Sequence, residues 1–523
     1  MTRTAIAFLA LAACGLTGTG TVACTGGGAD SPAAGTGLAG HERLPSSIAA
    51  QRPTWGPCRD LPGGGTGSAQ PAPAFQCATV KVPLNYAKPD ERTIGIALIR
   101  AKATRPESRI GSLLFNFGGP GGSGVDALAQ SAADYSALNT RYDLVGFDPR
   151  GVGRSTPVTC VDDRRMDQIT AMDDSPDTPA EERALADTRV SYDQGCEARA
   201  GTVLPYVGTR SAARDMDVIR DALGDRGLSY FGVSYGTWLG GSYANQLPRN
   251  VGRAVLDGAV DTKIGDVQLD LQQAAAFQRA LGAFGATCAR LGTTACPLGR
   301  DSRAVVATTG RLLNGLDAHP LPTRDRTRPL TQSLGTTGVL AALYSEQLWP
   351  LLARGLTEAT RAKDGSTLLA LADAQLGRRE DGRYTNLQAA NTAISCADTT
   401  ERHTAEEVRR LEPRFRGASP IFGPSMAWSL LQCSGWPVRG DDANKEVSAP
   451  SAPPMVVVGN TGDPATPYAW APGLVDEIGG RTVLLTLKGQ GHGAYDTGNA
   501  CVRKAVDRYL LDGVVPPNGT VCG

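Results

Sequence analysis

One serine of this sequence stands in a setting that suits a nucleophile. Ser234 is the centre of the segment 232–236, GVSYG, which follows an apolar run and precedes a stretch of small residues. A serine on a sharp turn from a strand into a helix needs glycine two residues to either side, because neighbouring backbone passes too close for a Cβ atom. The pattern G-x-S-x-G also arises by chance, but a predicted strand and a predicted helix flank it here. We therefore predict that Ser234 is the nucleophile of an acyl-transfer reaction.

A serine hydroxyl is a weak nucleophile unless a base accepts its proton, and the chain offers four histidines for that task. His41 lies in the Gly- and Ala-rich N-terminal segment, His319 precedes a proline in a polar loop, and His403 lies in a charged run. His492 instead follows the apolar run 482–487, in a loop of small residues. We predict that His492 is the general base.

The base needs an acid that accepts a hydrogen bond from its second ring nitrogen and fixes its tautomer. Asp463 comes a few residues after the predicted strand 455–458, in the chain order serine, acid, histidine. Asp257, after a strand that ends at Leu256, is the alternative. We prefer Asp463 because its strand immediately precedes the one that leads to His492.

Acyl transfer also needs hydrogen-bond donors for the oxyanion that forms in the transition state. The glycine-rich run 117–122, FGGPGG, follows a predicted strand, where bare backbone can present its N–H groups. We predict that the backbone N–H groups of Gly119 and Tyr235 form the oxyanion hole. A glycine-rich loop can instead hold phosphate, but this one lacks the Lys-Ser/Thr of a P-loop and the spacing of a dinucleotide site. We predict no metal and no other cofactor.

Short apolar runs alternate with longer helical patterns, which favours an α/β fold with a mostly parallel sheet covered by helices. Apolar residues recur every three or four positions from Ala212 to Leu223, and Gly224 ends that helix. This helix precedes the strand that leads to Ser234, so we predict that it packs on the sheet beside that strand. The predicted strands are 78–82, 94–99, 112–117, 142–147, 228–233, 254–256, 455–458 and 482–487.

The short strands disappear between about residues 262 and 447, where Leu- and Ala-rich helical patterns replace them. We predict that 262–447 form a helical cap inserted before the C-terminal strands, and that 75–261 and 448–523 form the core. At 523 residues the chain is long enough for both. Lys plus Arg and Asp plus Glu are balanced at 52 each, without a basic stripe, so nucleic acid is not an expected partner.

The N-terminus is typical of a secretory leader, because Arg3 precedes the apolar run 5–13, which is too short to span a bilayer. Segments that end at Cys14 and at Cys24 both resemble lipoprotein cleavage sites. The chain has 12 cysteines, and cleavage before a lipidated Cys24 leaves ten that can pair. We therefore predict a signal peptide over 1–24 and a lipid on Cys24.

A tether rich in Gly, Pro, Ser and Ala then spans 25–74. The alternative is an ordinary secreted protein, cleaved near Ala33 or Ala34. Both versions place the mature chain outside the cytoplasm, at the cell surface or in the medium, and a lipid anchor is the expected contact with the membrane.

The other ten cysteines lack the close C-x-x-C pairs of a structural zinc site, and an oxidising compartment favours disulfides. Sequence alone does not determine which cysteines pair, but neighbours in order would close short loops. The first pairing to expect joins Cys58 with Cys77, Cys160 with Cys196, Cys288 with Cys296, Cys396 with Cys433, and Cys501 with Cys522.

Together these motifs resemble the secreted tripeptidyl aminopeptidases of actinomycetes, which have the α/β-hydrolase fold and are related to the prolyl aminopeptidases. The segments 116–124, 146–153 and 232–236, with the C-terminal acid and base, carry the resemblance, which covers about 54–522. It implies a serine exopeptidase that releases short peptides, most often tripeptides, from free N-termini.

The resemblance also implies site residues and one difference. Ser234, Asp463 and His492 match the family's triad, and Gly119 matches its oxyanion glycine. The prolyl aminopeptidases have histidine before the paired glycines, whereas this chain has Phe117, so their narrow preference for proline is not implied.

An exopeptidase must also bind the α-ammonium group of its peptide, which calls for a carboxylate near the nucleophile. Glu346 and Asp398 lie in the predicted cap beside apolar residues, and either could bind it, although each could equally be a helix-surface or capping acid. An esterase or lipase of the same fold is an alternative that needs the triad but no such acid. An inactive lipoprotein that binds peptides is a further alternative, which the complete triad disfavours.

Overall fold

The computed structural model describes residues 44–59, 61 and 74–523. The predicted signal peptide, Cys24 and most of the predicted tether lie outside these residues. Among the described residues, no helix combines the length and apolar character that crossing a bilayer requires.

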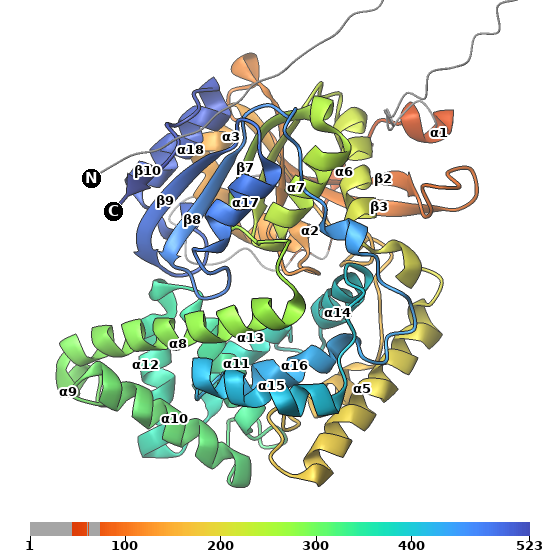
Figure 1. Cartoon of the computed structure of the whole chain (residues 1–523). Coiled ribbons are helices and arrows are strands. Elements are labelled where there is room, and N and C mark those ends of the chain that lie inside the picture. The colour runs from red at the N-terminus through yellow and green to blue at the C-terminus, as the bar shows by residue number, and fades with distance from the viewer. Residues whose placement is uncertain (1–43, 60, 62–73) are drawn as a thin grey trace, which may run out of the picture. The chain divides into compact units, whose positions relative to one another are not determined.

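A ten-stranded sheet forms the core, in the order β1-β2-β3-β5-β4-β6-β7-β8-β9-β10 (Figure 1). The pairs from β1 to β5 at one end are antiparallel, and all pairs from β5 through β10 are parallel. The strands are β1 (Gly56–Pro57), β2 (Phe75–Pro83), β3 (Thr93–Ala101), β4 (Gly111–Asn116), β5 (Tyr142–Phe147), β6 (Leu228–Val233), β7 (Val251–Asp257), β8 (Val456–Gly462), β9 (Val483–Gln490) and β10 (Thr520–Cys522).

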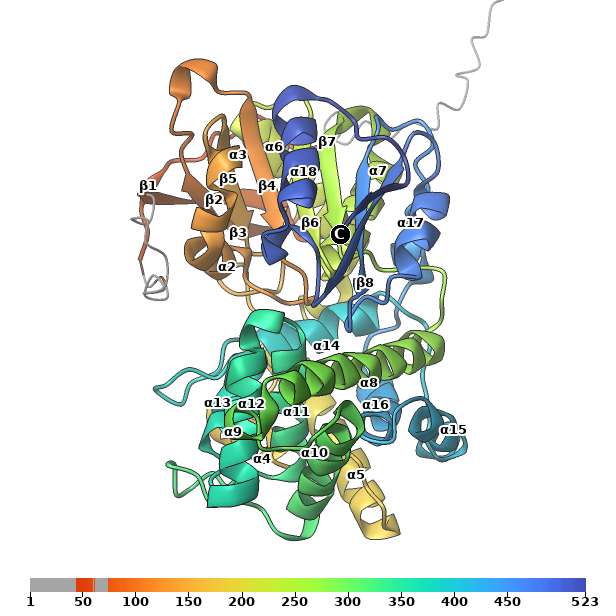
Figure 2. The same cartoon turned by 90° about the vertical axis from the view of Figure 1, so that its left-hand side faces the viewer.

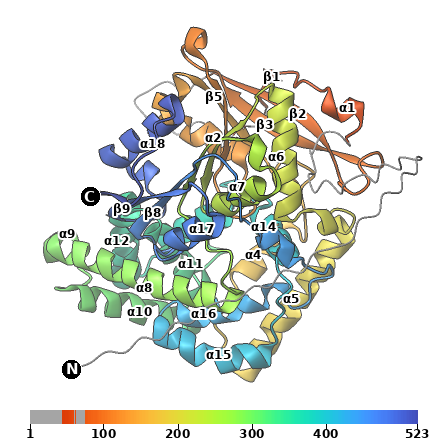
Figure 3. The ribbon, with the colours of Figure 1, turned by 45° about the horizontal axis from the view of Figure 1, so that its top comes forward.

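Each of the eight predicted strands is present within a few residues, and the predicted mostly parallel sheet is confirmed. Every residue of β4 and β5 is buried, because helices cover both faces of the sheet there. Strand side chains on one face of the sheet pack under α6 (Thr209–Leu223), α7 (Tyr235–Gln246) and α17 (Trp470–Ile478). Strand side chains on the opposite face pack under α2 (Gly124–Ser131), α3 (Ser136–Asn139) and α18 (Ala500–Asp512). Figure 3 shows α18 and α7 on either side of the strands.

The helix that was predicted to end before Gly224 is α6, and Gly224 adopts φ 81°, a left-handed conformation that glycine takes without strain. It packs against α7, the helix that follows Ser234. A short helix, α1 (Ser46–Ala49), also contacts α6.

A helical cap lies at the carboxyl ends of the parallel strands (Figure 2). It has a hydrophobic core of its own, which includes Phe284 and Trp349. The helices between β7 and β8 are α8 (Asp266–Arg290), α9 (Gly292–Ala295), α10 (Ser302–Ala318), α11 (Gln332–Leu343), α12 (Trp349–Thr357), α13 (Ser366–Leu376), α14 (Leu387–Ala397), α15 (Ala405–Ala418) and α16 (Gly423–Ser429).

The cap also contains α4 (Asp163–Thr170) and α5 (Pro179–Ala200) (Figure 2), although the sequence pattern predicted that both belong to the core segment 75–261. Asp167 of α4 pairs with Arg328 and Arg378 of the cap. The structure therefore differs from the predicted boundary, since two separate insertions build the cap. The sequence of α4 and α5 is mostly polar, so no apolar pattern indicated which part of the molecule they would contact.

Five disulfides join the same pairs that sequence order predicted. Cys160–Cys196 ties the loop before α4 to α5, and Cys396–Cys433 ties the end of α14 to the turn after α16. The prediction of disulfides is confirmed for all ten of these cysteines.

Candidate active site

Four loops meet at the carboxyl edge of the parallel strands, which is where α/β sheets place their sites. The loop after β4 carries the glycine-rich run, and the turn after β6 carries Ser234. The loops after β8 and β9 carry Asp463 and His492. The topology thus brings together residues that lie far apart in the chain.

Ser234 occupies a strained turn between β6 and α7, with φ 59° and ψ −125°. A positive φ on a residue other than glycine costs about 1 to 3 kcal/mol, so the surroundings must hold it. The Ser234 N–H donates to the Asp257 carbonyl at 2.9 Å, and the Thr237 hydroxyl donates to the Ser234 carbonyl at 2.7 Å.

The two flanking glycines are sterically required, as the G-x-S-x-G pattern predicted. A Cβ on Gly232 would lie 2.3 Å from the Gly236 carbonyl oxygen, and a Cβ on Gly236 would lie 2.6 Å from the Asn116 carbonyl oxygen. Both distances are far below van der Waals contact, so the turn cannot form with a side chain at either position.

His492 and Asp463 form a close pair. The Nδ1 atom of His492 lies 3.0 Å from each carboxylate oxygen of Asp463. The Asp463 side chain is fully buried and also accepts from the backbone N–H groups of Ala465, Thr466 and Gly493 at 2.8 to 2.9 Å. These contacts fix the carboxylate, so it can hold the imidazole in one orientation and leave Nε2 free to accept a proton.

Asp257, the alternative acid, does not bind the imidazole ring but supports its loop. Its carboxylate accepts from the backbone N–H groups of Ala494 and Tyr495 at 2.8 to 3.1 Å. Burial raises the pKa of Asp257 to about 7. Asn460 supports the same loop from the other side, where its amide donates to the carbonyls of Gly491 and Gly493 at 2.8 and 3.0 Å.

Two neighbours of the base were not found from the sequence. The Thr466 hydroxyl donates to Asp463 at 2.9 Å and lies 3.3 Å from His492 Nδ1. Tyr344, directly after α11 in the cap, accepts from the His492 backbone N–H at 2.7 Å, and its ring meets the imidazole edge to face at 5.3 Å. Thr466 lies only three residues from Asp463 and could have been suspected on that ground, whereas nothing in the sequence linked Tyr344 to His492.

The glycine-rich loop lies directly against Ser234. A Cβ on Gly118 would come within 2.8 Å of the Ser234 Cβ atom. Gly118, Gly119 and Gly121 have φ of 93°, 115° and 95°, values that exclude most other residues. The predicted oxyanion donors, the N–H groups of Gly119 and Tyr235, therefore belong to two segments that both adjoin Ser234.

The two predicted ammonium-binding acids lie in different environments. Asp398 is buried, and its carboxylate accepts from the N–H and the hydroxyl of Thr209, the first residue of α6. This contact makes Asp398 a capping acid, which is the alternative that the sequence left open. Glu346 is exposed, in a short helical turn after Tyr344, and a Cβ on Gly491 would lie 3.8 Å from its backbone nitrogen. Of the two, Glu346 is the one beside the loop of His492.

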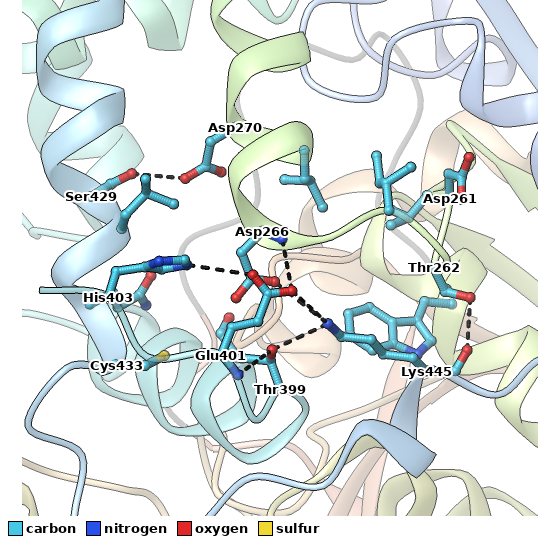
Figure 4. A pocket seen from close by; sticks show the side chains of 17 residues that line it. Asp261, Thr262, Asp266, Asp270, Thr399, Glu401, His403, Ser429, Cys433 and Lys445 are labelled. Atoms are coloured by element: carbon cyan, nitrogen blue, oxygen red, sulfur yellow. Dashed lines mark hydrogen bonds and ion pairs between the residues drawn. The ribbon is translucent and has the colours of Figure 1, made fainter. Parts of the chain in front are cut away.

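A separate cavity of about 160 Å³ lies where the start of α8 and the loop after α14 meet the core (Figure 4). In it, Asp266, Glu401 and His403 offer ligand atoms within 4.8 Å of one another, a spacing that suits a metal ion. The ammonium group of Lys445 lies 3.6 Å from Asp266 and 3.8 Å from Glu401. Since a cation already neutralises these carboxylates, the group is better explained as a cluster of ion pairs that joins the start of α8, the loop after α14 and the segment before β8.

The environment of His492 leads to a prediction about pH. Burial alone would lower the pKa of His492, but the carboxylate of Asp463, with smaller effects of Asp257 and Asp496, raises it above the ordinary value of 6.5. A base must be neutral to act, so kcat/KM should rise with pH through a midpoint above 6.5. Protonated His492 favours the folded state: that stabilisation is complete below the unfolded pKa and is lost as the pH rises through the folded pKa.

The measurement is the pH profile of kcat/KM for wild type, Asp463→Asn and Asp257→Asn. The residual activity of Asp463→Asn should have its midpoint at a lower pH than that of the wild type, because the negative charge beside His492 is gone. Asp257→Asn should move it much less. A wild-type midpoint below 6.5 would mean that the charge of Asp463 does not control this histidine.

Comparison with known proteins agrees with this geometry. Residues 111–349 match the family model described as alpha/beta hydrolase fold, and residues 419–522 match the model described as TAP-like protein. Serine protease Hip1 of Mycobacterium tuberculosis is 36% identical, over 93% of this chain and 94% of its own length. Carboxylesterase B of the same organism is 37% identical, over 94% and 95%.

Tripeptidyl aminopeptidase of Streptomyces lividans is 32% identical, over 86% of this chain and 83% of its own length. The two family models together include Ser234, Asp463 and His492 among the residues that they match. The chain therefore belongs to the family of the tripeptidyl aminopeptidases and is a serine peptidase with the α/β-hydrolase fold.

Proposed function

We propose that this protein releases short peptides, in the first instance tripeptides, from the free N-termini of longer ones through an acyl-enzyme on Ser234. The observation that carries the proposal is the buried pair of Asp463 and His492, at the same sheet edge as the strained turn of Ser234. The relatives named tripeptidyl aminopeptidase support the choice of substrate.

In the proposed reaction, the Ser234 hydroxyl oxygen attacks the scissile carbonyl carbon while His492 Nε2 accepts its proton. The oxyanion then receives hydrogen bonds from the N–H groups of Gly119 and Tyr235. The C–N bond breaks as His492 returns the proton to the leaving amine. Water attacks the acyl-enzyme by the same route and releases the short peptide. Asp463 stabilises the imidazolium that forms twice in each cycle.

We further propose that Glu346 binds the α-ammonium group of the substrate. It lies in the cap beside the loop of His492, and its side chain is exposed and thus accessible to a peptide. Asp398 is a weaker candidate, because Thr209 already occupies its carboxylate. The cap would close one end of the groove and so limit how many residues fit before the scissile bond.

Acetylating the N-terminus of an Ala-Ala-Pro-Ala peptide should lower kcat/KM about tenfold or more, since a charge-assisted hydrogen bond is lost. Products are identified by mass, and fluorophosphonate labelling of Ser234 serves as a control for an intact site. Glu346→Gln should remove the preference for the free peptide without removing the labelling. Asp398→Asn is measured in the same way, because the acid that binds the ammonium group is the one whose replacement removes the preference. Equal rates on both peptides, or cuts deep within long peptides, would indicate an endopeptidase or a general esterase.

An esterase is a second candidate, because a relative of equal similarity is named Carboxylesterase B. Matched ester and amide substrates with the same acyl peptide separate the two functions. A peptidase should hydrolyse the amide substrate, whereas an esterase should hydrolyse only the ester substrate. An inactive peptide-binding lipoprotein would show no fluorophosphonate labelling at all.

We also propose that the protein is exported and is tethered by a lipid on Cys24. The leader-like N-terminal sequence supports export, and so do the five disulfides, which persist in oxidising compartments.

A further inference from the structure

Helix α14 of the cap contacts the glycine-rich loop directly and is linked to Tyr235 through Thr209. It lies between the sheet and the other cap helices (Figures 1 and 2). Its middle touches the glycine-rich loop 117–122, and Asp398, the residue directly after the helix, connects through Thr209 to the side chain of Tyr235. These two links connect the cap to the predicted oxyanion donors, whereas Tyr344 connects it to the loop of the base.

The first contact is with the loop of Gly119. The Asn391 amide donates to the Pro120 carbonyl at 3.1 Å, and Gln432 donates to the Asn391 amide oxygen at 3.1 Å, which orients it. A Cβ on Gly121 would lie 2.7 Å from the Asn391 backbone nitrogen, so helix and loop are in direct contact. The glycines of this loop have no side chains with which to fix their backbone, so neighbours such as α14 help to constrain it.

The second contact is with Tyr235. Its hydroxyl lies 2.6 Å from the Thr209 hydroxyl oxygen. Thr209 in turn donates its backbone N–H to Asp398 at 2.8 Å and donates its hydroxyl to the same carboxylate. Since Asp398 directly follows the last residue of α14, a chain of hydrogen bonds links the end of the helix to Tyr235, whose N–H is the second donor.

Both ends of α14 are held by the rest of the molecule. Asn386, just before the helix, donates to the carbonyls of Gly151 and Val158 at 2.8 and 3.0 Å and accepts from the Gly153 N–H at 2.8 Å. The disulfide Cys396–Cys433 holds the other end, next to Gln432. The helix therefore behaves as a rigid support rather than as a loose cover.

We propose that α14 sets the positions of the two oxyanion donors, with Asn391 and Asp398 as positioning residues. The inference rests on the proposed function, since it takes Gly119 and Tyr235 as the donors. An oxyanion donor is effective only at about 2.7 to 3.1 Å from the developing charge, and a misplacement of about 1 Å can cost on the order of a hundredfold in rate. Contacts of α14 thus control transition-state stabilisation without touching the substrate.

The test compares Asn391→Ala and Tyr235→Phe with wild type on an Ala-Ala-Pro p-nitroanilide. Each variant should lower kcat about tenfold or more with KM changed by less than about twofold. A peptide boronic acid of the same sequence, whose tetrahedral adduct places an oxygen in the oxyanion hole, should bind more weakly by the same factor. The affinity of the product Ala-Ala-Pro should stay unchanged, which loss of fold or of the groove would not produce.

Asn245→Ala is the matched control, because that amide also donates to a distant carbonyl, of Ser448 at 2.8 Å, but lies away from the loop. It should leave kcat and boronate affinity as in wild type. The loss of kcat in the double variant Asn391→Ala with Gln432→Ala should be smaller than the two single losses combined, because both changes act on one contact. The losses of kcat from Asn391→Ala and Tyr235→Phe should combine almost additively in free energy.

The proposal is overturned if boronate and product affinities fall equally, or if neither falls in Asn391→Ala and Tyr235→Phe. Should Asn391→Ala fail to fold, Tyr235→Phe alone decides, since it removes one oxygen and keeps the N–H donor. Ser234→Ala, measured beside them, separates the two hypotheses. Hydrolysis that survives in Ser234→Ala contradicts the proposed function, whereas an inactive Ser234→Ala with unaffected α14 variants contradicts only the role of the helix.

Discussion

Replacing Ser234 by alanine should lower hydrolysis by about three or more orders of magnitude, because the covalent route is lost while the oxyanion donors and the binding groups remain. The protein should stay folded, since alanine removes only one oxygen and relieves none of the contacts that hold the turn. Those contacts are made by the backbone of Ser234, to Asp257 and Thr237. The measurements are kcat/KM and fluorophosphonate labelling, with thermal unfolding as a check of the fold.

Ser229→Ala is the matched control, because Ser229 lies on the same strand and its hydroxyl donates a long hydrogen bond to the Tyr142 hydroxyl, at 3.4 Å, rather than to any residue of the triad. It should keep nearly normal activity and full labelling. Near-normal activity of Ser234→Ala would remove this serine from its proposed role, and with it the whole triad.

Asp463→Asn should be the next most severe change, with a loss of about three to four orders of magnitude in kcat. An amide can donate to His492 Nδ1, which would place the proton on Nε2, the nitrogen that must accept it from Ser234. The Thr466 hydroxyl, which donates to the Asp463 carboxylate at 2.9 Å, would at the same time face a side chain with one acceptor oxygen in place of two. The measurement is kcat with a saturating amide substrate, together with thermal unfolding.

Asp257→Asn provides the comparison for this acid. Its carboxylate accepts from backbone N–H groups of Ala494 and Tyr495, and an amide oxygen can still accept from them. We expect about a tenfold loss or less, through small shifts of the loop that carries His492. A crippled Asp257→Asn beside a mild Asp463→Asn would show that the acid has been assigned to the wrong residue.

The cap contributes to the site at two separate points. Tyr344 accepts from the backbone of His492 at 2.7 Å, and Asn391 donates to the loop of Gly119 at 3.1 Å. A part of the molecule that only restricted access would not need contacts with both the base and the oxyanion loop. Changes in the cap should therefore alter catalysis as well as the choice of substrate.

Much of this site follows from the sequence because its rules are local. The turn of Ser234 requires glycine at 232 and 236 for steric reasons that act within four residues. Strand and helix periodicity likewise reports on neighbouring positions, so the elements and the order of Ser234, Asp463 and His492 along them could be predicted. The disulfide pairs could be predicted because each joins cysteines that are adjacent in order.

Only the tertiary structure decided which partner each polar side chain has. The sequence left open whether Asp398 binds the substrate ammonium or caps a helix, and only the structure shows that it binds Thr209, which lies 189 positions away. Asp257 and Asp463 both follow buried strands, and only the packing of their loops brings one of them to the imidazole ring of His492. A hydrogen bond depends on the distance between two groups, and for segments far apart in the chain that distance is set by the fold as a whole rather than by local sequence.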